Sequence, residues 1–162
     1  MTMTANPYAT FLGERYAVDV VRETPQRLAL IVEQLGNSGL ERSLAPGKWP
    51  ARLILCHLAD CEIAFGFRLR QALAEDNPLM QPFDQTKWSA PYGQFSGKQA
   101  LEVFLSLRGW NVAFIQTLSE EDFNRPANHP ERGAMQLRTI VETMAGHDEN
   151  HLLQLKAIAQ AS

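Results

Sequence analysis

Four long stretches of this sequence repeat their apolar residues with the period of an α-helix, and no stretch alternates convincingly with the period of a β-strand. We expect helices over residues 14–35, 50–75, 96–118 and 136–159. Each helix carries an apolar stripe that must be hidden from water, and four such helices can hide their stripes against one another. The sequence therefore predicts an all-α fold, a single four-helix bundle over residues 1–162, with long connections before and after the third helix.

Several details of these helices are specific enough to compare with a structure. Pro25 falls inside the first helix, where it either kinks the helix or, with Thr24 as the cap, begins a second segment. The helix over 96–118 is apolar nearly all round, which predicts that it is the most enclosed of the four. The first helix is expected to bury Tyr16, Val20, Leu28, Ile31 and Leu35.

The connection over residues 77–95 is unusually long and is rich in Pro, Gln and Gly. Loops of this length in a compact domain are usually functional or disordered. This one carries the aromatic residues Phe83, Trp88, Tyr92 and Phe95, which argue against disorder because they supply apolar area to dock. We expect it either to pack over one end of the bundle or to cover a site, in which case Trp88 and Tyr92 would contact a substrate.

The composition excludes several classes of partner. The chain has 15 basic and 18 acidic residues and no basic tract, so that binding to nucleic acid is not expected. No apolar run is long enough to span a membrane, and Met1–Tyr8 lacks the pattern of a signal peptide. Cys56 and Cys61 lie about 140° apart on one helix and cannot pair with each other. Two free thiols indicate a reducing cytoplasm.

Two histidines of the last predicted helix lie on its apolar side. His147 and His151 are four residues apart, which places them about 40° apart round the helix and one turn apart along it. The apolar residues that continue the same stripe are Ile140, Met144, Leu155 and Ile158. Both imidazoles are therefore expected to point into the bundle.

His57 repeats this pattern on the helix over 50–75, on a stripe formed by Leu53, Cys61, Phe65 and Leu69. Three buried imidazoles are unfavourable unless each nitrogen finds a partner, and one divalent cation would satisfy all three. We therefore predict that His57, His147 and His151 bind one metal ion; the alternative is three hydrogen-bonded core histidines. Three protein ligands leave a coordination place for water or substrate, as in catalytic sites.

Imidazole ligands suit several divalent ions. We expect zinc or nickel first, with iron, manganese or copper as alternatives. The histidine pair does not match the zinc-protease motif, in which Glu directly follows the first His, because Asp148 occupies that position here.

Other polar residues near the histidines each allow two interpretations. Asp60, Asp148 and Glu149 are the nearest carboxylates in sequence, and they either orient the ligand imidazoles or are solvated charges on the helix surface. Cys61, one turn from His57, either approaches the metal or fills space as a small apolar residue.

Arg108 and His129 are further candidates for contact with a substrate. Arg108 lies on an apolar stripe and requires a carboxylate or an anionic ligand, and we expect an ion pair with Asp84 or Glu62 before a substrate contact. His129 lies in a loop before Pro130 and is expected to form a wall of the site or to act as an occasional ligand.

Several short motifs follow one another along the chain in the order typical of one family. They are Gly47-Lys48-Trp49-Pro50, His57-Leu-Ala-Asp60-Cys-Glu62, Arg68-Leu-Arg70, Phe83-Asp84-Gln85 with Trp88, His129-Pro130-Glu-Arg-Gly133, His147-Asp148 and His151-Leu-x-Gln154. Each motif alone is weak, but together they cover about residues 15–160, and the chain resembles the DinB/YfiT-like superfamily (DinB-like domain).

This resemblance implies a four-helix bundle with a metal site made by one His of the second helix and a His pair of the fourth. On this sequence those roles fall on His57, His147 and His151. Members are often homodimers, which implies a homodimer here. Some relatives transfer low-molecular-weight thiols such as bacillithiol, glutathione or mycothiol, and one branch is described as metal-dependent hydrolases.

Three functions remain open on the sequence. The first is a metal-dependent thiol S-transferase or hydrolase that acts on a small molecule under the aromatic loop. The second is a non-catalytic metal-binding or ligand-sensing bundle with a structural metal. The third is an interaction bundle whose three core histidines are satisfied without a metal.

Overall fold

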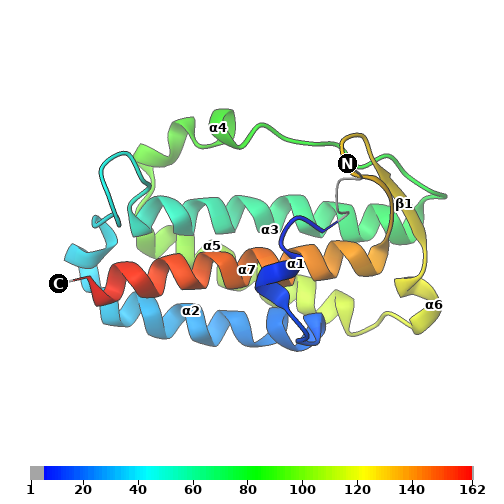
Figure 1. Ribbon diagram of the computed structural model, residues 1–162, viewed down its shortest axis with the longest axis horizontal. Coiled ribbons are helices and arrows are strands. Elements are labelled where there is room, and N and C mark those ends of the chain that lie inside the picture. Colours follow the sequence, from blue (N-terminus) through cyan, green and yellow to red (C-terminus); the bar gives the residue numbers. More distant parts are fainter. Residues whose placement is uncertain (1–5, 162) are drawn as a thin grey trace.

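The computed structural model describes residues 6–161 and is a four-helix bundle (Figure 1). Its long helices are α2 (Ala17–Leu40), α3 (Ala51–Ala74), α5 (Gly97–Ile115) and α7 (Leu137–Gln160). The short elements are α1 (Ala9–Leu12), α4 (Gln85–Trp88), the 3-10 helix η1 (Ala90–Gln94), α6 (Glu120–Phe123), β1 (Pro126–His129) and β2 (Gly133–Gln136). The predicted all-α fold is confirmed. The prediction that Met1–Tyr8 is not a signal peptide concerns residues that lie partly outside this described range.

The long helices pack as two parallel pairs. Figure 1 shows that α2 and α7 lie side by side and run in one direction, while α3 and α5 form a second pair that runs the opposite way. Because α3 and α5 are parallel neighbours, the chain must return along the bundle between them, and the 24 residues of α3 span about 36 Å. The connection over 77–95 covers this distance along the outside of the bundle (Figure 1). The expectation that it packs over one end is therefore wrong.

The first helix agrees with its prediction in part. It continues through Pro25, so the alternative of a second segment capped by Thr24 is wrong, and its non-helical residue is Gly36, whose φ is 58°. After this break the chain stays helical to Leu40. Tyr16 was expected to be buried but is 59% exposed, because it precedes the first residue of α2. The other residues expected on its apolar side are buried.

The helix α5 is not the most enclosed helix, contrary to the expectation from its composition. Trp110 is 70% and Val103 46% exposed, whereas α3 and α7 bury most of their residues. The difference arises because α7 is covered by α1 and α3 is covered by η1. The two four-residue strands that precede α7 form an antiparallel hairpin, which is too short to show a period in the sequence.

The apolar core is divided into two clusters that lie at different heights of the bundle. On α7 the cluster near its start ends at Ala145, and the other begins at Leu152. Between them α7 places His147, Asp148 and His151, all of which are buried. The other three long helices have the same division, so that a layer of buried polar side chains crosses the middle of the bundle.

Arg108 of α5 occupies the centre of this polar layer and has no exposed surface. It donates to Glu62 of α3 over 2.6 Å and to both carboxylate oxygens of Asp148 of α7 over 2.6 and 2.9 Å. It also donates to the carbonyl oxygen of Val21 in α2 over 3.1 Å. Thr24 of α2 completes the set with a 2.9 Å bond to Asp148. All four long helices are therefore joined through one guanidinium group.

This network decides between the partners expected for Arg108. The ion pair with Glu62 is confirmed, and the one with Asp84 is wrong because Asp84 caps the exposed start of α4. Burial alone would lower the pKa of Arg108, but the facing carboxylates of Asp148 and Glu62 more than offset this and raise it. The structure does not support a substrate contact for Arg108, because its side chain is fully enclosed by these partners.

No helix within residues 6–161 combines the length and the apolar character that crossing a membrane requires. Cys56 and Cys61 are both free, as their spacing predicts, and both are buried.

We expect Arg108→Met to lower the free energy of unfolding by about 3–5 kcal/mol, because it leaves two buried carboxylates without a counter-charge. Urea denaturation followed by circular dichroism measures this change. Arg22→Met is the control, since the Arg22–Asp19 ion pair is exposed and its loss should change stability by about 1 kcal/mol or less. Equal effects of the two substitutions would show that the network does not hold the bundle together.

Candidate metal centre

The three predicted histidines converge inside the bundle. His57 Nε2 lies 3.0 Å from His147 Nε2, which in turn lies 3.1 Å from His151 Nε2. One nitrogen of each ring falls within 4.8 Å of the other two, and all three residues are buried. Two helices therefore direct three imidazoles at one point, as the apolar stripes predict.

These distances fit a shared cation. Metal–nitrogen bonds of about 2.1 Å separate two imidazole nitrogens by about 3.0 Å at a right angle and about 3.4 Å at a tetrahedral angle. Hydrogen bonds alone fit less well, since an imidazole nitrogen has one in-plane hydrogen or one in-plane lone pair. His147 Nε2 therefore cannot form well-aligned bonds to both neighbours. The donor set accordingly suits a divalent metal ion better than a set of mutually bonded core histidines.

The buried position keeps the three imidazoles neutral. Burial lowers the pKa of His57 to about 3, and the neighbouring His151 adds to this effect. Burial also lowers the pKa of His147 well below its ordinary value, with further contributions from His151 and His57. The pKa of His151 is lowered by burial as well, although Gln154 and Asp148 raise it. At neutral pH each ring consequently has a lone pair available for a metal.

The amino-terminal segment forms one wall of the centre. The ring of Tyr8 lies 5.2 Å from the ring of His147, edge to face. Gly146 allows this approach, because a Cβ atom at that position would lie 2.4 Å from the carbonyl oxygen of Tyr8. Phe65 and Trp49 pack against His147 and His57, with ring centres 5.9 and 5.4 Å apart. Aromatic rings thus surround the imidazoles.

The carboxylates that were candidates for orienting the histidines have other partners. Asp60 accepts a 2.8 Å hydrogen bond from the hydroxyl of Tyr92. Asp148 is bound to Arg108, and Glu149 forms ion pairs with Arg27 and with Arg15. Asp148 and Glu149 are buried, so the alternative of solvated surface charges is wrong for both.

Gln154 supplies the outer contact that the carboxylates do not. Its side-chain oxygen lies 2.9 Å from His151 Nδ1 and fixes that ring's orientation. A residue three positions after a ligand on the same helix is within reach of it, so spacing could have identified Gln154. In the described part of the chain, the buried Nδ1 of His147 has no hydrogen-bond partner.

Cys61 lies beside the centre but is not one of the converging donors. Its Sγ is 3.5 Å from His57 Nε2 and 3.8 Å from His147 Nε2. The group of donors within 4.8 Å of one another consists of the three histidines. Burial raises the pKa of Cys61, and the carboxylates of Glu62 and Asp60 raise it further. Cys61 thus lies outside the converging donor group, which favours the interpretation that it fills space.

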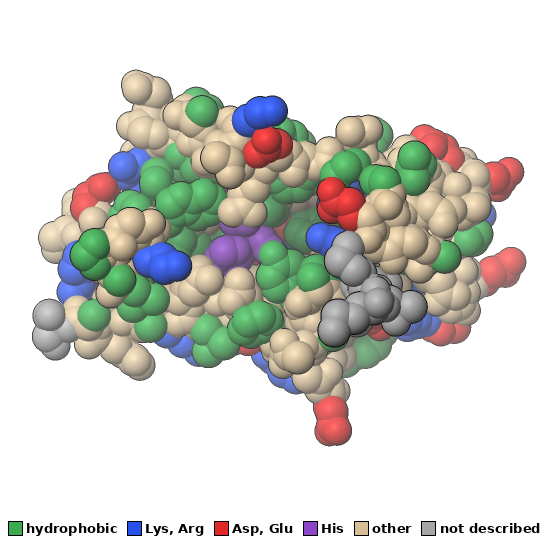
Figure 2. Space-filling view, turned by 45° about the horizontal axis from the view of Figure 1, so that its top comes forward, with side chains coloured by type: hydrophobic (Ala, Val, Ile, Leu, Met, Phe, Trp, Pro, Cys, Tyr) green, Lys and Arg blue, Asp and Glu red, His purple; other side chains and the backbone are tan. Residues whose placement is uncertain are grey.

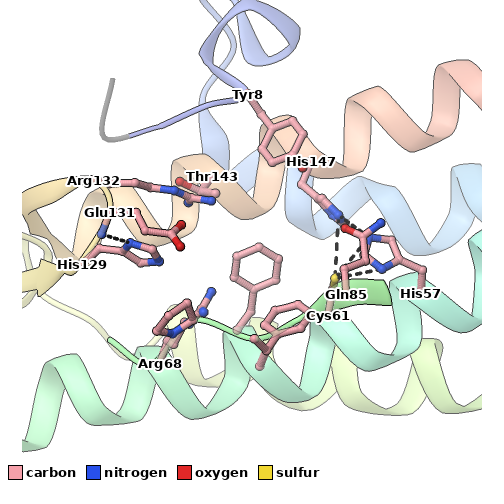
Figure 3. Close-up of a pocket in the computed structure, with 14 residues that line it drawn as sticks. Tyr8, His57, Cys61, Arg68, Gln85, His129, Glu131, Arg132, Thr143 and His147 are labelled. Atoms are coloured by element: carbon pink, nitrogen blue, oxygen red, sulfur yellow. Dashed lines mark hydrogen bonds between the residues drawn. The ribbon is translucent and has the colours of Figure 1, made fainter. Parts of the chain in front are cut away.

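Two cavities reach the centre. The first, of about 140 Å³, is lined by His57 and His147 (Figure 3). The second, of about 480 Å³, is lined by His151 together with Trp49. Gln85, in the long connection over 77–95, lines both cavities. Figure 2 shows histidine side chains at the bottom of a hollow on this face of the molecule.

Of the residues His129, Trp88 and Tyr92, which were predicted to contact a substrate, only His129 lines one of these two cavities. His129 is buried and lines the first cavity, at the side away from His57 (Figure 3). Trp88 lines neither cavity and stacks on Phe83 with ring centres 4.5 Å apart. Tyr92 lines neither as well, since its ring is buried and its hydroxyl is bound to Asp60. The connection over 77–95 therefore reaches the site through Phe83 and Gln85 instead.

The amino-acid sequence of this chain is similar to those of a known protein family. The sequence profile of the DinB superfamily matches residues 21–155, a range that includes all three converging histidines. A protein of Oceanobacillus iheyensis is 28% identical over 148 residues, which are 88% of this chain and 84% of that protein. YfiT of Bacillus subtilis is 26% identical over 88% of this chain and 82% of its own length. Both carry the name "putative metal-dependent hydrolase".

The fold is likewise similar to a solved structure. The structure of YfiT from Bacillus subtilis superposes with a TM-score of 0.81 at 24% sequence identity, and covers 89% of this chain and 84% of that one. Its topology is described as an unusual four-helix bundle. The fold of this chain is thus similar to a known four-helix bundle.

We expect His57→Ala, His147→Ala and His151→Ala each to abolish binding of one equivalent of Zn²⁺ or Ni²⁺, because each removes one of three donors. Elemental analysis of untagged protein and isothermal titration measure the loss. His129→Ala is the matched control, since this histidine lines the cavity without joining the converging group, and it should bind the metal normally. Normal metal content in any of the three ligand variants would refute the assignment.

The metal-free protein should lose stability as the pH falls below about 6.5, the pKa of a histidine in the unfolded chain. Folded His57 stays neutral down to a pKa of about 3, so between these values unfolding takes up a proton at this site. The contribution of His57 to the free energy of unfolding therefore rises with pH, by about 1.4 kcal/mol per pH unit. In His57→Leu the slope of unfolding free energy against pH, measured by urea titration, should be smaller by this amount. Identical slopes would contradict a buried neutral His57.

Proposed function

This chain belongs to the DinB superfamily, and from that premise we propose that it is a metal-dependent enzyme that hydrolyses a small molecule. The observation that carries the proposal is the convergence of three imidazole nitrogens at the end of a cavity. A site of three histidines leaves a coordination place, which is typical of catalytic rather than structural metal sites. The names of the relatives support hydrolysis as the reaction.

A bound divalent ion would supply a Lewis acid and would lower the pKa of water to about 7. The protein supplies the enclosure and the hydrogen-bond donors. Tyr8, Phe65 and Phe83 line the first cavity and exclude water from one side of a bound molecule. His129 accepts a hydrogen bond at Nδ1 from the backbone of Glu131 over 3.2 Å, so its neutral ring carries the proton on Nε2. That Nε2–H is a donor for an oxygen atom of the substrate.

The second cavity favours an alternative reaction, the transfer of a low-molecular-weight thiol to an electrophile. Such a reaction needs room for two organic molecules at one centre, and two separate cavities contact the ligand histidines. The metal would hold the thiol as a thiolate. Lys48, which lines the second cavity, would pair with an acidic group of that thiol. Zinc and nickel are the ions we propose for either reaction.

We further propose that the protein acts as a homodimer. Large apolar side chains remain exposed on two neighbouring helices: Ile63 and Phe67 on α3, and Val103 and Trp110 on α5. Large apolar side chains that stay exposed on neighbouring helices favour a protein–protein interface. A partner subunit would cover the face of α5 that the bundle itself leaves exposed.

The zinc-loaded protein should hydrolyse at least one member of a panel of small esters, lactones and amides, and activity should disappear on removal of the metal and return with it. Product formation is followed by liquid chromatography and mass spectrometry. The same panel with added thiols, cysteine and glutathione among them, tests the transfer reaction by the mass of the thioester and of the alcohol or amine that is released. No turnover in either assay would refute an enzymatic function.

Cys61→Ala separates an enzyme from a bundle with a structural metal. If three histidines alone hold the ion, this variant retains one equivalent of metal and its activity. Loss of the metal from Cys61→Ala would indicate a closed site with a fourth protein ligand, which is typical of structural zinc.

A further inference from the structure

The first cavity extends away from the histidines to a second group of polar side chains. Figure 3 shows His57, His147 and Cys61 at one end, and Arg68, His129, Glu131 and Arg132 at the other. Arg68 belongs to α3, whereas the other three residues lie at the end of β1 and in the turn that leads to β2. Two parts of the chain therefore place two guanidinium groups beside one cavity.

Unlike the guanidinium group of Arg108, these two groups do not stabilise the fold through ion pairs. Within residues 6–161, neither Arg68 nor Arg132 forms an ion pair with a carboxylate. Burial lowers the pKa of Arg68, and the positive charge of Arg132 lowers it further. Two like charges thus lie near each other and neither is ion-paired with a carboxylate, an arrangement that a bound anion would relieve.

Arg68 is held in place but keeps most of its donors. Its guanidinium group lies 5.6 Å from the centre of the Phe83 ring and donates one 2.6 Å hydrogen bond to the carbonyl oxygen of Gln81. An arginine has five N–H donors, so that several remain for a ligand. A fixed guanidinium plane with free donors suits bidentate binding of a carboxylate or phosphate group.

His129 adds a neutral donor at the same end. Burial lowers its pKa, as do Arg132 and Arg68, while Glu131 raises it. Since its Nδ1 accepts from the backbone of Glu131, the proton on Nε2 is available to an oxygen of the ligand. Glu131 is the acidic side chain that lines this cavity, against two arginines, so positive charge exceeds negative charge there.

The spacing on α3 defines how far apart the two ends are. His57, Cys61, Phe65 and Arg68 follow one another on the face of α3 that lines the cavity. The eleven residues from His57 to Arg68 correspond to about 16 Å along the helix axis, and side chains on a helix lean toward its amino terminus. A ligand that reaches both ends must be elongated, and its middle would lie against Phe65 and Phe83.

We propose that the substrate is an elongated small molecule with a terminal oxyanion, a carboxylate or a phosphate, that Arg68, Arg132 and His129 bind while its reactive group lies at the histidines. This inference rests on the proposed function for the reactive end only. The oxyanion site itself follows from the charges and donors of the chain, and it selects anionic molecules over neutral ones of the same length.

Titration of the zinc-loaded protein with inorganic phosphate, and separately with succinate, tests the site by isothermal calorimetry at low ionic strength. Arg68→Gln and Arg132→Gln should each weaken binding of the preferred anion at least tenfold. Arg22→Gln changes the net charge equally but lies on the exposed side of α2, so it should bind like the wild type. The stronger of the two anions identifies the terminal group as phosphate or carboxylate.

Equal affinities of wild type, Arg68→Gln and Arg132→Gln would overturn the inference, because any binding would then reflect the metal alone. Metal content and thermal melting of each variant verify that the centre and the fold are retained. Arg132→Gln keeps the test decisive if Arg68→Gln loses its packing on Phe83, since Arg132 lies on the hairpin turn outside the bundle. An oxyanion site in a protein without hydrolytic activity would refute the proposed function and leave the oxyanion site intact.

Discussion

A full positive charge sits in the middle of this bundle, and the arrangement of the long helices depends on its neutralisation. Arg108 of α5 is bound by Glu62 of α3, by Asp148 of α7 and by a backbone carbonyl group of α2. A buried charge without partners is very unfavourable, so only a packing that brings all these groups together is stable. The two apolar clusters above and below this layer supply the burial energy, while the polar layer fixes which helices are neighbours.

The metal centre is a direct neighbour of this network along the chain. Asp148 directly follows His147, and Glu62 lies five residues after His57 on α3, so the carboxylates that hold Arg108 also fix the helices that carry the imidazoles. Burial keeps the histidines neutral without separate partners for each nitrogen, and the cavities on either side give access to them. The same polar layer thus specifies the fold and positions the donors of the metal centre.

Much of this arrangement could be predicted from the sequence because it depends on helical periodicity. The apolar stripes correctly placed His57, His147 and His151 at one buried point, and the ion pair of Arg108 with Glu62 followed from its position on such a stripe. The features that the sequence did not reveal depend on how helices are paired in space. The parallel packing of α3 with α5, which sends residues 77–95 along the bundle, has no local signal, and neither has the hairpin that brings Arg132 to the cavity.

The order of the helices along the chain also determines when the centre can form. His57 and His147 are 90 residues apart, and the last helix brings two of the three imidazoles together with the second carboxylate for Arg108. A nascent chain that ends before α7 offers Arg108 one carboxylate, that of Glu62. The apolar stripes of α2, α3 and α5 then lack the fourth helix against which they pack. Folding is consequently expected to be cooperative and to await the carboxyl-terminal end of the chain. Such distant contacts make it slow for a helical protein.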